Sequence, residues 1–302
     1  MSRERHILFA GPAHWRVACH GSGAARWTEV PVASPQPLPS ELAAALADAL
    51  CRNGHRGDGV LLALPSAWCL CAGIRVEDLP RRKRLGAMLF RMEEKLPVAA
   101  EEVAADFAGD AASALGIAVA RDALEPIIEA LEQRGIAIER ICPEALLAAQ
   151  WLLTQRGLAD PPIDAILWGD GANLQWIVCE DGRPVGWRML WHADTELELA
   201  VRSSALAANQ PLRLAACAAE PAVLERLRGM PEIQLVSQTD LSLADAAAAG
   251  GAAALSGTLV PWIDLRQFGL PPQDRYGRLG RPLTAALAAA CLLLATLSGA
   301  ML

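Results

Sequence analysis

The chain has 302 residues, of which 53% are hydrophobic, so it can bury a substantial core in one large domain or two. This composition excludes a disordered chain. The net charge of -7 and the absence of any Lys/Arg cluster interleaved with aromatic residues argue against nucleic acid as a partner.

Two further features of the sequence favour a reducing, cytoplasmic compartment for most of the chain. Its eight cysteines are scattered and lie mostly in apolar runs, where a free thiol behaves as a small hydrophobic side chain. The apolar run that follows Arg3 and Arg5 at the N-terminus is too short for a signal peptide.

The first part of the chain, residues 1–160, alternates short strands with helices. Apolar runs and alternating patterns punctuated by Gly and Pro predict strands over 6–10, 15–19, 27–32, 59–64, 69–76, 103–108, 115–120 and 136–141. Apolar residues at helical spacing predict helices over 40–52, 79–96, 122–133 and 143–155.

The second part, residues 161–262, starts again with strands and then alternates helix and strand. We expect strands over 165–168, 174–180, 185–191, 212–216 and 234–236, and helices over 195–207, 221–227 and 242–255. Each part thus has the element order of the ribonuclease-H-like half that occurs twice in actin-like proteins. The predicted fold class is α/β, actin-like, with mixed sheets in both halves.

The end of the chain has a different character. Residues 283–302 carry no charge over twenty positions, which is about the length that spans a bilayer core, so we predict a single transmembrane helix. Residues 263–282 form a basic juxtamembrane linker in which Arg275, Arg278 and Arg281 place the preceding domain in the cytoplasm. The alternative is a buried C-terminal helix of a soluble domain.

Small residues recur four positions apart in this predicted helix. Ala285 with Ala289, and Ala295 with Gly299, have the spacing that lets two membrane helices approach closely, so a helix–helix contact and a homodimer are expected there. The alternative is general alanine richness, which extends over nearly the whole chain.

Motifs that carry chemistry are weak. Asp170 stands between two glycines and is interpreted as part of a hairpin turn rather than a phosphate-binding loop. Cys69 and Cys71 lack a second ligand pair at suitable spacing. The acidic residues around Glu93 and Glu101 are expected on a solvated face. The sequence therefore predicts no catalytic, cofactor-binding or metal-ligating residue.

Three segments carry a family resemblance, in the right order along the chain. Residues 81–107 (RRKRLGAMLFRMEEKLPVAAEEVAADF), 119–150 and 262–287 resemble segments of type II secretion protein L (GspL) and of its pilus relative PilM. Asp264 stands where the family usually has Asn. The family continues into a small periplasmic domain, so we expect a fragment or a shortened member.

The resemblance also bears on nucleotide binding. Nucleotide-binding relatives carry Asp-x-Gly loops with Ser or Thr at the start of each half, whereas residues 9–17 (FAGPAHWRV) lack the acid and the hydroxyls, and Trp168 stands near the second expected Asp. The chain thus resembles the secretion protein more than the ATP-binding pilus protein. Because helix N-termini can bind anions without such loops, weak nucleotide binding stays open.

The resemblance implies a scaffold in the bacterial inner membrane, not an enzyme. Its cytoplasmic domain would dock the secretion ATPase, a GspE-like protein, and its membrane helix would pair with a GspM-like protein. The alternatives are a pilus or competence assembly protein that fuses PilM-like and PilN-like pieces, and a degenerate actin-like ATPase.

Overall fold

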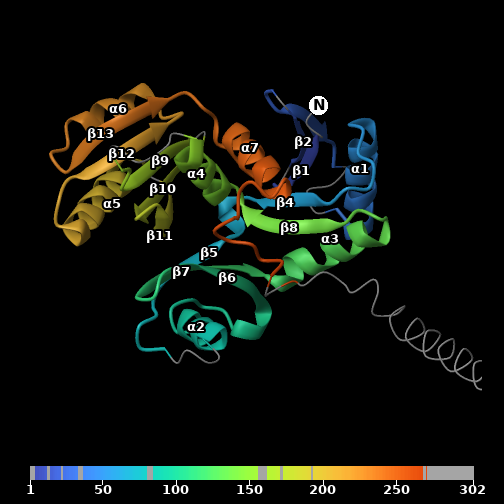
Figure 1. Ribbon diagram of the computed structural model, residues 1–302, viewed down its shortest axis with the longest axis horizontal. Coiled ribbons are helices and arrows are strands. Elements are labelled where there is room, and N and C mark those ends of the chain that lie inside the picture. The colour runs from blue at the N-terminus through green and yellow to red at the C-terminus, as the bar shows by residue number, and fades with distance from the viewer. Residues whose placement is uncertain are drawn as a thin grey trace, which may run out of the picture. The chain divides into compact units, whose positions relative to one another are not determined.

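A computed structural model describes residues 4–270, except 12–13, 22, 33–36, 80–83, 156–161, 171–172, 192 and 268–269. The described residues form three β-sheets with helices packed on and between them (Figure 1). All of them belong to one compact unit, which ends at Leu270.

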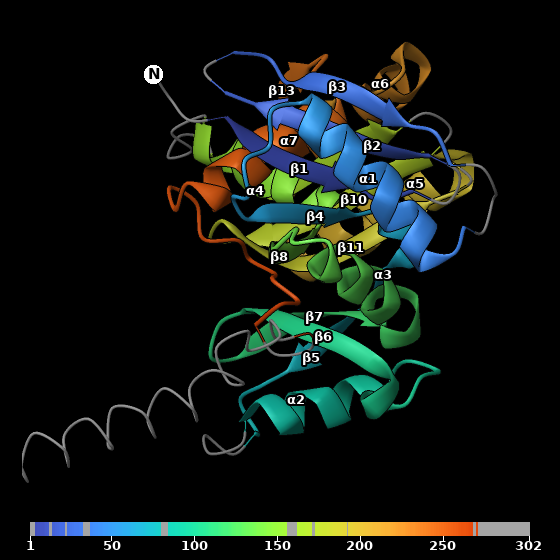
Figure 2. The same cartoon turned by 90° about the vertical axis from the view of Figure 1, so that its right-hand side faces the viewer.

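The first sheet has the strand order β3-β2-β1-β4-β8. Strand β1 pairs antiparallel with β2 and parallel with β4, so the sheet is mixed, as predicted. Figure 2 shows helices α1 and α3 covering one of its faces. The bounds are β1 (Arg5–Phe9), β2 (Trp15–His20), β3 (Arg26–Val30), α1 (Pro39–Arg52), β4 (Val60–Leu64), α3 (Arg121–Gln133) and β8 (Ile138–Pro143).

The second sheet repeats this arrangement with the order β11-β10-β9-β12-β13, which confirms the predicted similarity of the two halves. Helices α5 and α6 pack on one face, where their buried side chains cluster with those of β9 and β12. The bounds are β9 (Ala165–Asp170), β10 (Asn173–Glu180), β11 (Arg183–Leu190), α5 (Ala193–Ala208), β12 (Leu212–Cys217), α6 (Pro221–Arg228) and β13 (Ile233–Thr239).

A third, antiparallel sheet with the order β5-β7-β6 is inserted between β4 and α3. The sequence predicts its strands, but it does not predict that they pair with one another instead of joining the first sheet. The bounds are η1 (Ser66–Trp68), β5 (Leu70–Arg75), α2 (Arg84–Glu93), η2 (Ala100–Glu102), β6 (Val103–Gly109) and β7 (Ser113–Ala120).

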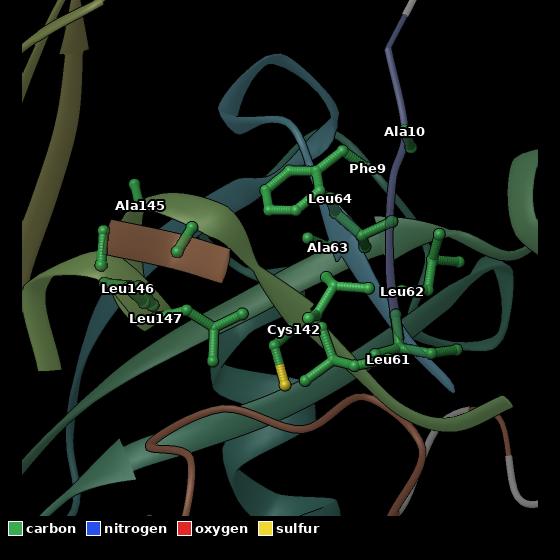
Figure 3. Packing of buried hydrophobic residues seen from close by; sticks show 14 of the residues in the cluster. Phe9, Ala10, Leu61, Leu62, Ala63, Leu64, Cys142, Ala145, Leu146 and Leu147 are labelled. Carbon is green, nitrogen blue, oxygen red and sulfur yellow. The ribbon is translucent and has the colours of Figure 1, made fainter. Parts of the chain in front are cut away.

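The core lies around two helices, α4 (Glu144–Gln155) and α7 (Leu243–Leu255), which are buried on most sides and share one hydrophobic cluster with both large sheets. Figure 3 shows part of this cluster, with side chains from β1, β4, β8 and α4. The two helices pack closely because α7 has glycine where it crosses α4: a Cβ at Gly250 would lie 2.7 Å from the carbonyl oxygen of Leu147.

Within the part of the chain that the structure describes, no helix is long and apolar enough to cross a membrane. The predicted transmembrane helix, residues 283–302, lies outside the described residues. The same holds for the predicted flank and contact residues, which are Arg275, Arg278, Arg281, Ala285, Ala289, Ala295 and Gly299.

Candidate functional site

The last described segment, residues 263–267 with Leu270, is bound to the body of the domain, and we name it the C-terminal strap. Its backbone joins the first sheet, because the Leu265 N–H donates to the carbonyl oxygen of Ile141 in β8 over 2.9 Å. Just before it, the side chain of Gln150 in α4 donates to the carbonyl oxygen of Val260 (2.7 Å) and accepts from the backbone N–H of Trp262 (2.9 Å).

Asp264 fixes the strap through its carboxylate, which belongs to a residue only 2% exposed. Its Oδ2 accepts from Arg140 Nη1 over 2.9 Å, and its Oδ1 accepts from the backbone N–H of Ile141 over 3.1 Å. The Asp264 N–H donates to Oδ2 of Asp106 in β6 over 2.7 Å. One strap residue therefore contacts both the first sheet and the third.

Arg266 fixes the strap from its other side and is 4% exposed. Its Nε donates to the carbonyl oxygen of Ile138 (3.0 Å), its Nη1 donates to that of Leu270 (2.8 Å), and its Nη2 pairs with Glu132 of α3. Buried charges are costly unless they are paired and hydrogen-bonded, and both strap charges meet this condition. Side-chain and backbone hydrogen bonds thus hold the strap to three elements, which are β8, β6 and α3.

Asp106 is the third buried charged residue of this joint. Burial raises the pKa of its carboxyl group, the nearby charge of Asp264 adds to the rise, and hydrogen bonds from the backbone N–H groups of Asp264 and Phe107 counter part of it. The predicted linker begins at residue 263, and its first five residues lie in this joint. Sequence reasoning missed the burial of Asp264 and Arg266 because charged side chains are usually exposed.

A groove of about 670 Å³ lies at the carboxyl end of β1 and the N-termini of α4 and α7. Gly11 is required at its edge, because a Cβ there would lie 2.4 Å from the carbonyl oxygen of His14. The groove is lined by Ala10, Gly11, His14, Arg16, Glu29, Val30, Pro31, Pro65, Glu144, Leu243 and Ala244.

Arg16, which lines this groove, stacks on two aromatic side chains of the first sheet. The Arg16 guanidinium lies over the Trp27 ring at 4.9 Å and over Phe9 at 5.8 Å. The Trp27 Nε1–H donates to Asp245 Oδ1 over 2.9 Å, which joins β3 to the first turn of α7. Arg16 thus has an aromatic partner on its own face of the sheet.

The Gly-Asp-Gly sequence stands where β9 and β10 pair antiparallel in a hairpin. Asp170 pairs with Asn173 at the end of β9 and β10, and the two residues between them lie outside the described residues. Trp168, which stands near the acid of nucleotide-binding relatives, is fully buried and donates from Nε1 to the Leu241 carbonyl oxygen over 3.1 Å. An indole therefore fills this position.

The remaining candidate groups have structural partners. The Cys71 thiol donates to the Trp187 carbonyl oxygen over 3.0 Å, and burial, followed by the nearby charge of Glu144, raises the pKa of Cys69. Glu93, Glu94, Glu101 and Glu102 are exposed, as predicted. Among the described residues, no group of three or more His, Cys, Asp or Glu side chains is placed to hold a metal ion.

Comparison with solved structures identifies the fold. The cytoplasmic domain of EpsL, an inner membrane component of the type II secretion system of Vibrio cholerae, has a TM-score of 0.56 at 12% identity, over 88% of this chain and 98% of that one. The PilM–PilN type IV pilus biogenesis complex gives 0.58 at 16% identity, over 84% and 99%. A Bacteroides thetaiotaomicron protein with an actin-like ATPase fold and unknown function gives 0.53 at 8%, over 82% and 96%.

These structures confirm the actin-like α/β fold and the likeness to GspL and PilM proteins that the three sequence segments indicate. No family model matches the sequence, and no curated protein matches it.

Proposed function

We propose that the chain is a non-enzymatic inner-membrane platform component of a type II secretion system, which docks the cytoplasmic secretion ATPase and links it to the membrane assembly. The observation that carries the proposal is the C-terminal strap, in an actin-like body similar to the EpsL cytoplasmic domain. An adaptor needs a firm connection between its docking body and its anchor, and the strap has the geometry for one.

The strap would transmit movement because it is bonded to three elements at once. A pull on the residues after Leu270 acts through Arg266 on β8 and α3, and through Asp264 on β8 and β6. A flexible tether would instead absorb the same displacement by changing its own length. In this proposal, motion of a GspE-like ATPase on the body reaches the membrane through the strap.

The anchor in this proposal is the apolar segment 283–302, with Arg275, Arg278 and Arg281 on its cytoplasmic side. A GspM-like protein and a second copy of the chain are its proposed partners there. The test is a variant that ends before Leu283, expressed in the secreting organism in place of the wild type. Secretion should stop in cells that carry this truncated variant. In the control variant, an unrelated apolar helix of equal length replaces residues 283–302, and this variant should stay in the membrane. Normal secretion by the truncated chain would contradict the proposal.

The absence of catalysis is also part of the proposal. Phosphoryl transfer needs a metal ion and compensating charge at the phosphates. Among the described residues that line the groove, none is a Ser, Thr or Asp, and Trp168 is buried. We expect no ATP hydrolysis above that of a variant in which Glu144, at the groove, is changed to Gln.

The second candidate is a pilus or competence platform, which the similarity to the PilM–PilN complex favours. The two candidate functions differ in the assembly to which the chain would belong, a type II secretion system or a pilus or competence system. Neighbouring genes for other secretion components would support the first, and neighbouring pilus or competence genes would support the second.

A further inference from the structure

A second pocket lies at the opposite end of β1 from the groove, and nothing in the proposed function uses it. Its volume is about 270 Å³, slightly below the usual range for small-molecule sites. Arg5 and His20, which pair across β1 and β2, form one side, and Trp151 of α4 forms another. Its floor is made of small α7 residues, which are Ala249, Ala252 and Ala253.

Among the described residues, Arg5 is a cation of the pocket that has no carboxylate partner. Arg5 makes no ion pair with any described residue, and no Asp or Glu lines the pocket. Glu4, the adjacent residue, pairs with Arg26 at 2.9 Å. Because neighbouring residues of an extended chain point to opposite faces, Glu4 lies on the other side of the sheet from Arg5. No described carboxylate therefore neutralises the positive charge of Arg5 in the pocket.

The other lining groups suit a flat apolar body. Trp151 packs against the hydrophobic core but remains partly exposed in the pocket, and its indole N–H makes no hydrogen bond with a described residue. Burial lowers the pKa of His20, and a hydrogen bond to the Gly21 backbone counters part of this fall, so the His20 ring adds a flat side to the pocket without a second firm cation. The alanine floor leaves space that larger side chains would fill.

We propose that this pocket, which we name the Arg5 pocket, binds a small anion attached to a flat apolar body, such as an aromatic carboxylate or an aromatic phosphate monoester. The guanidinium of Arg5 holds the anion through charge-assisted hydrogen bonds, and the body packs between Trp151 and the alanines of α7. This inference is independent of the proposed platform function.

The test is a calorimetric titration of the full chain with phenyl phosphate and with benzoate. Saturable binding at one site is expected for at least one of them, and Arg5→Gln should weaken it by about tenfold or more. Ala253→Met, which fills the floor, should also weaken it. The matched control is Arg56→Gln, which removes an exposed arginine elsewhere and should leave the affinity unchanged.

Three results would overturn the inference. They are the absence of saturable binding of either probe, an affinity that Arg5→Gln leaves unchanged, and equal binding of neutral benzyl alcohol. If inorganic phosphate alone bound as tightly as phenyl phosphate, the apolar part of the site would be wrong. Thermal unfolding of each variant shows whether a loss of binding comes from a loss of folding.

Discussion

Arg140 and Asp264 are 124 residues apart in the chain, yet Arg140 Nη1 lies 2.9 Å from Asp264 Oδ2 in a mostly buried ion pair. This pair holds the C-terminal strap against the body of the domain. The strap lies along the edge strand β8, and it also bonds to β6.

The first prediction concerns this pair. Asp264→Ala removes the acceptor for Arg140 and for the backbone N–H of Ile141, which leaves buried donors unpaired. We expect the free energy of unfolding to fall by about 4 kcal/mol, as measured by chemical denaturation of the chain.

The matched variant is Asp264→Asn, which keeps one acceptor oxygen and removes the charge. It should cost only about 1 kcal/mol. If Ala and Asn were equally tolerated, Asp264 would not hold the strap, and the structural basis of the proposed coupling would be lost.

The pKa of Asp106 gives the second prediction. Its folded-state pKa is raised above the ordinary value of 3.8, so the folded chain holds this proton to higher pH than the unfolded chain does. The free energy of unfolding should therefore fall as pH rises through this window. Asp106→Asn removes the titration, so its stability relative to wild type should improve from about pH 4 towards neutral pH. A constant difference between the two proteins over this range would refute the prediction.

The third prediction is that the contribution of Asp164 to the free energy of unfolding depends on pH in the opposite direction. Burial alone would raise its pKa, but hydrogen bonds from the side chain and backbone of Arg213, at 2.6 to 2.9 Å, outweigh burial and lower it. The stability it contributes is present above the ordinary pKa and is lost as pH falls through the folded pKa. Arg213→Lys cannot keep both side-chain bonds, so it should cost about 2 kcal/mol at pH 7. This cost should shrink in acid, as denaturation at several pH values would reveal.

Glycine at the groove provides the fourth prediction. Gly11→Ala places a Cβ against the carbonyl oxygen of His14, so the backbone at Gly11 and His14 must move apart, at a cost of about 2 kcal/mol. Gly73→Ala in β5 is the control, because a Cβ at Gly73 would meet no atom within 4 Å, and its effect should stay within about 0.5 kcal/mol. Equal thermal midpoints for the two variants would show that Gly11 is not required.

Much of the fold follows from local patterns. The helix predicted over 40–52 is α1, and the strand predicted over 59–64 is β4, because apolar periodicity is a property of neighbouring residues. The third sheet was not predicted as a separate unit, since strand pairing depends on contacts between distant segments. The burial of Asp264 and Arg266 depends on partners more than a hundred residues away, which no local pattern encodes.

The central claim is that the chain docks a secretion ATPase without using nucleotide. The most direct test titrates the full chain in nanodiscs with the N-terminal region of the organism's own secretion ATPase, in a calorimeter and without ATP. Our account predicts saturable binding. The absence of binding, especially if the chain instead bound and hydrolysed ATP, would contradict the platform function and favour a degenerate actin-like ATPase.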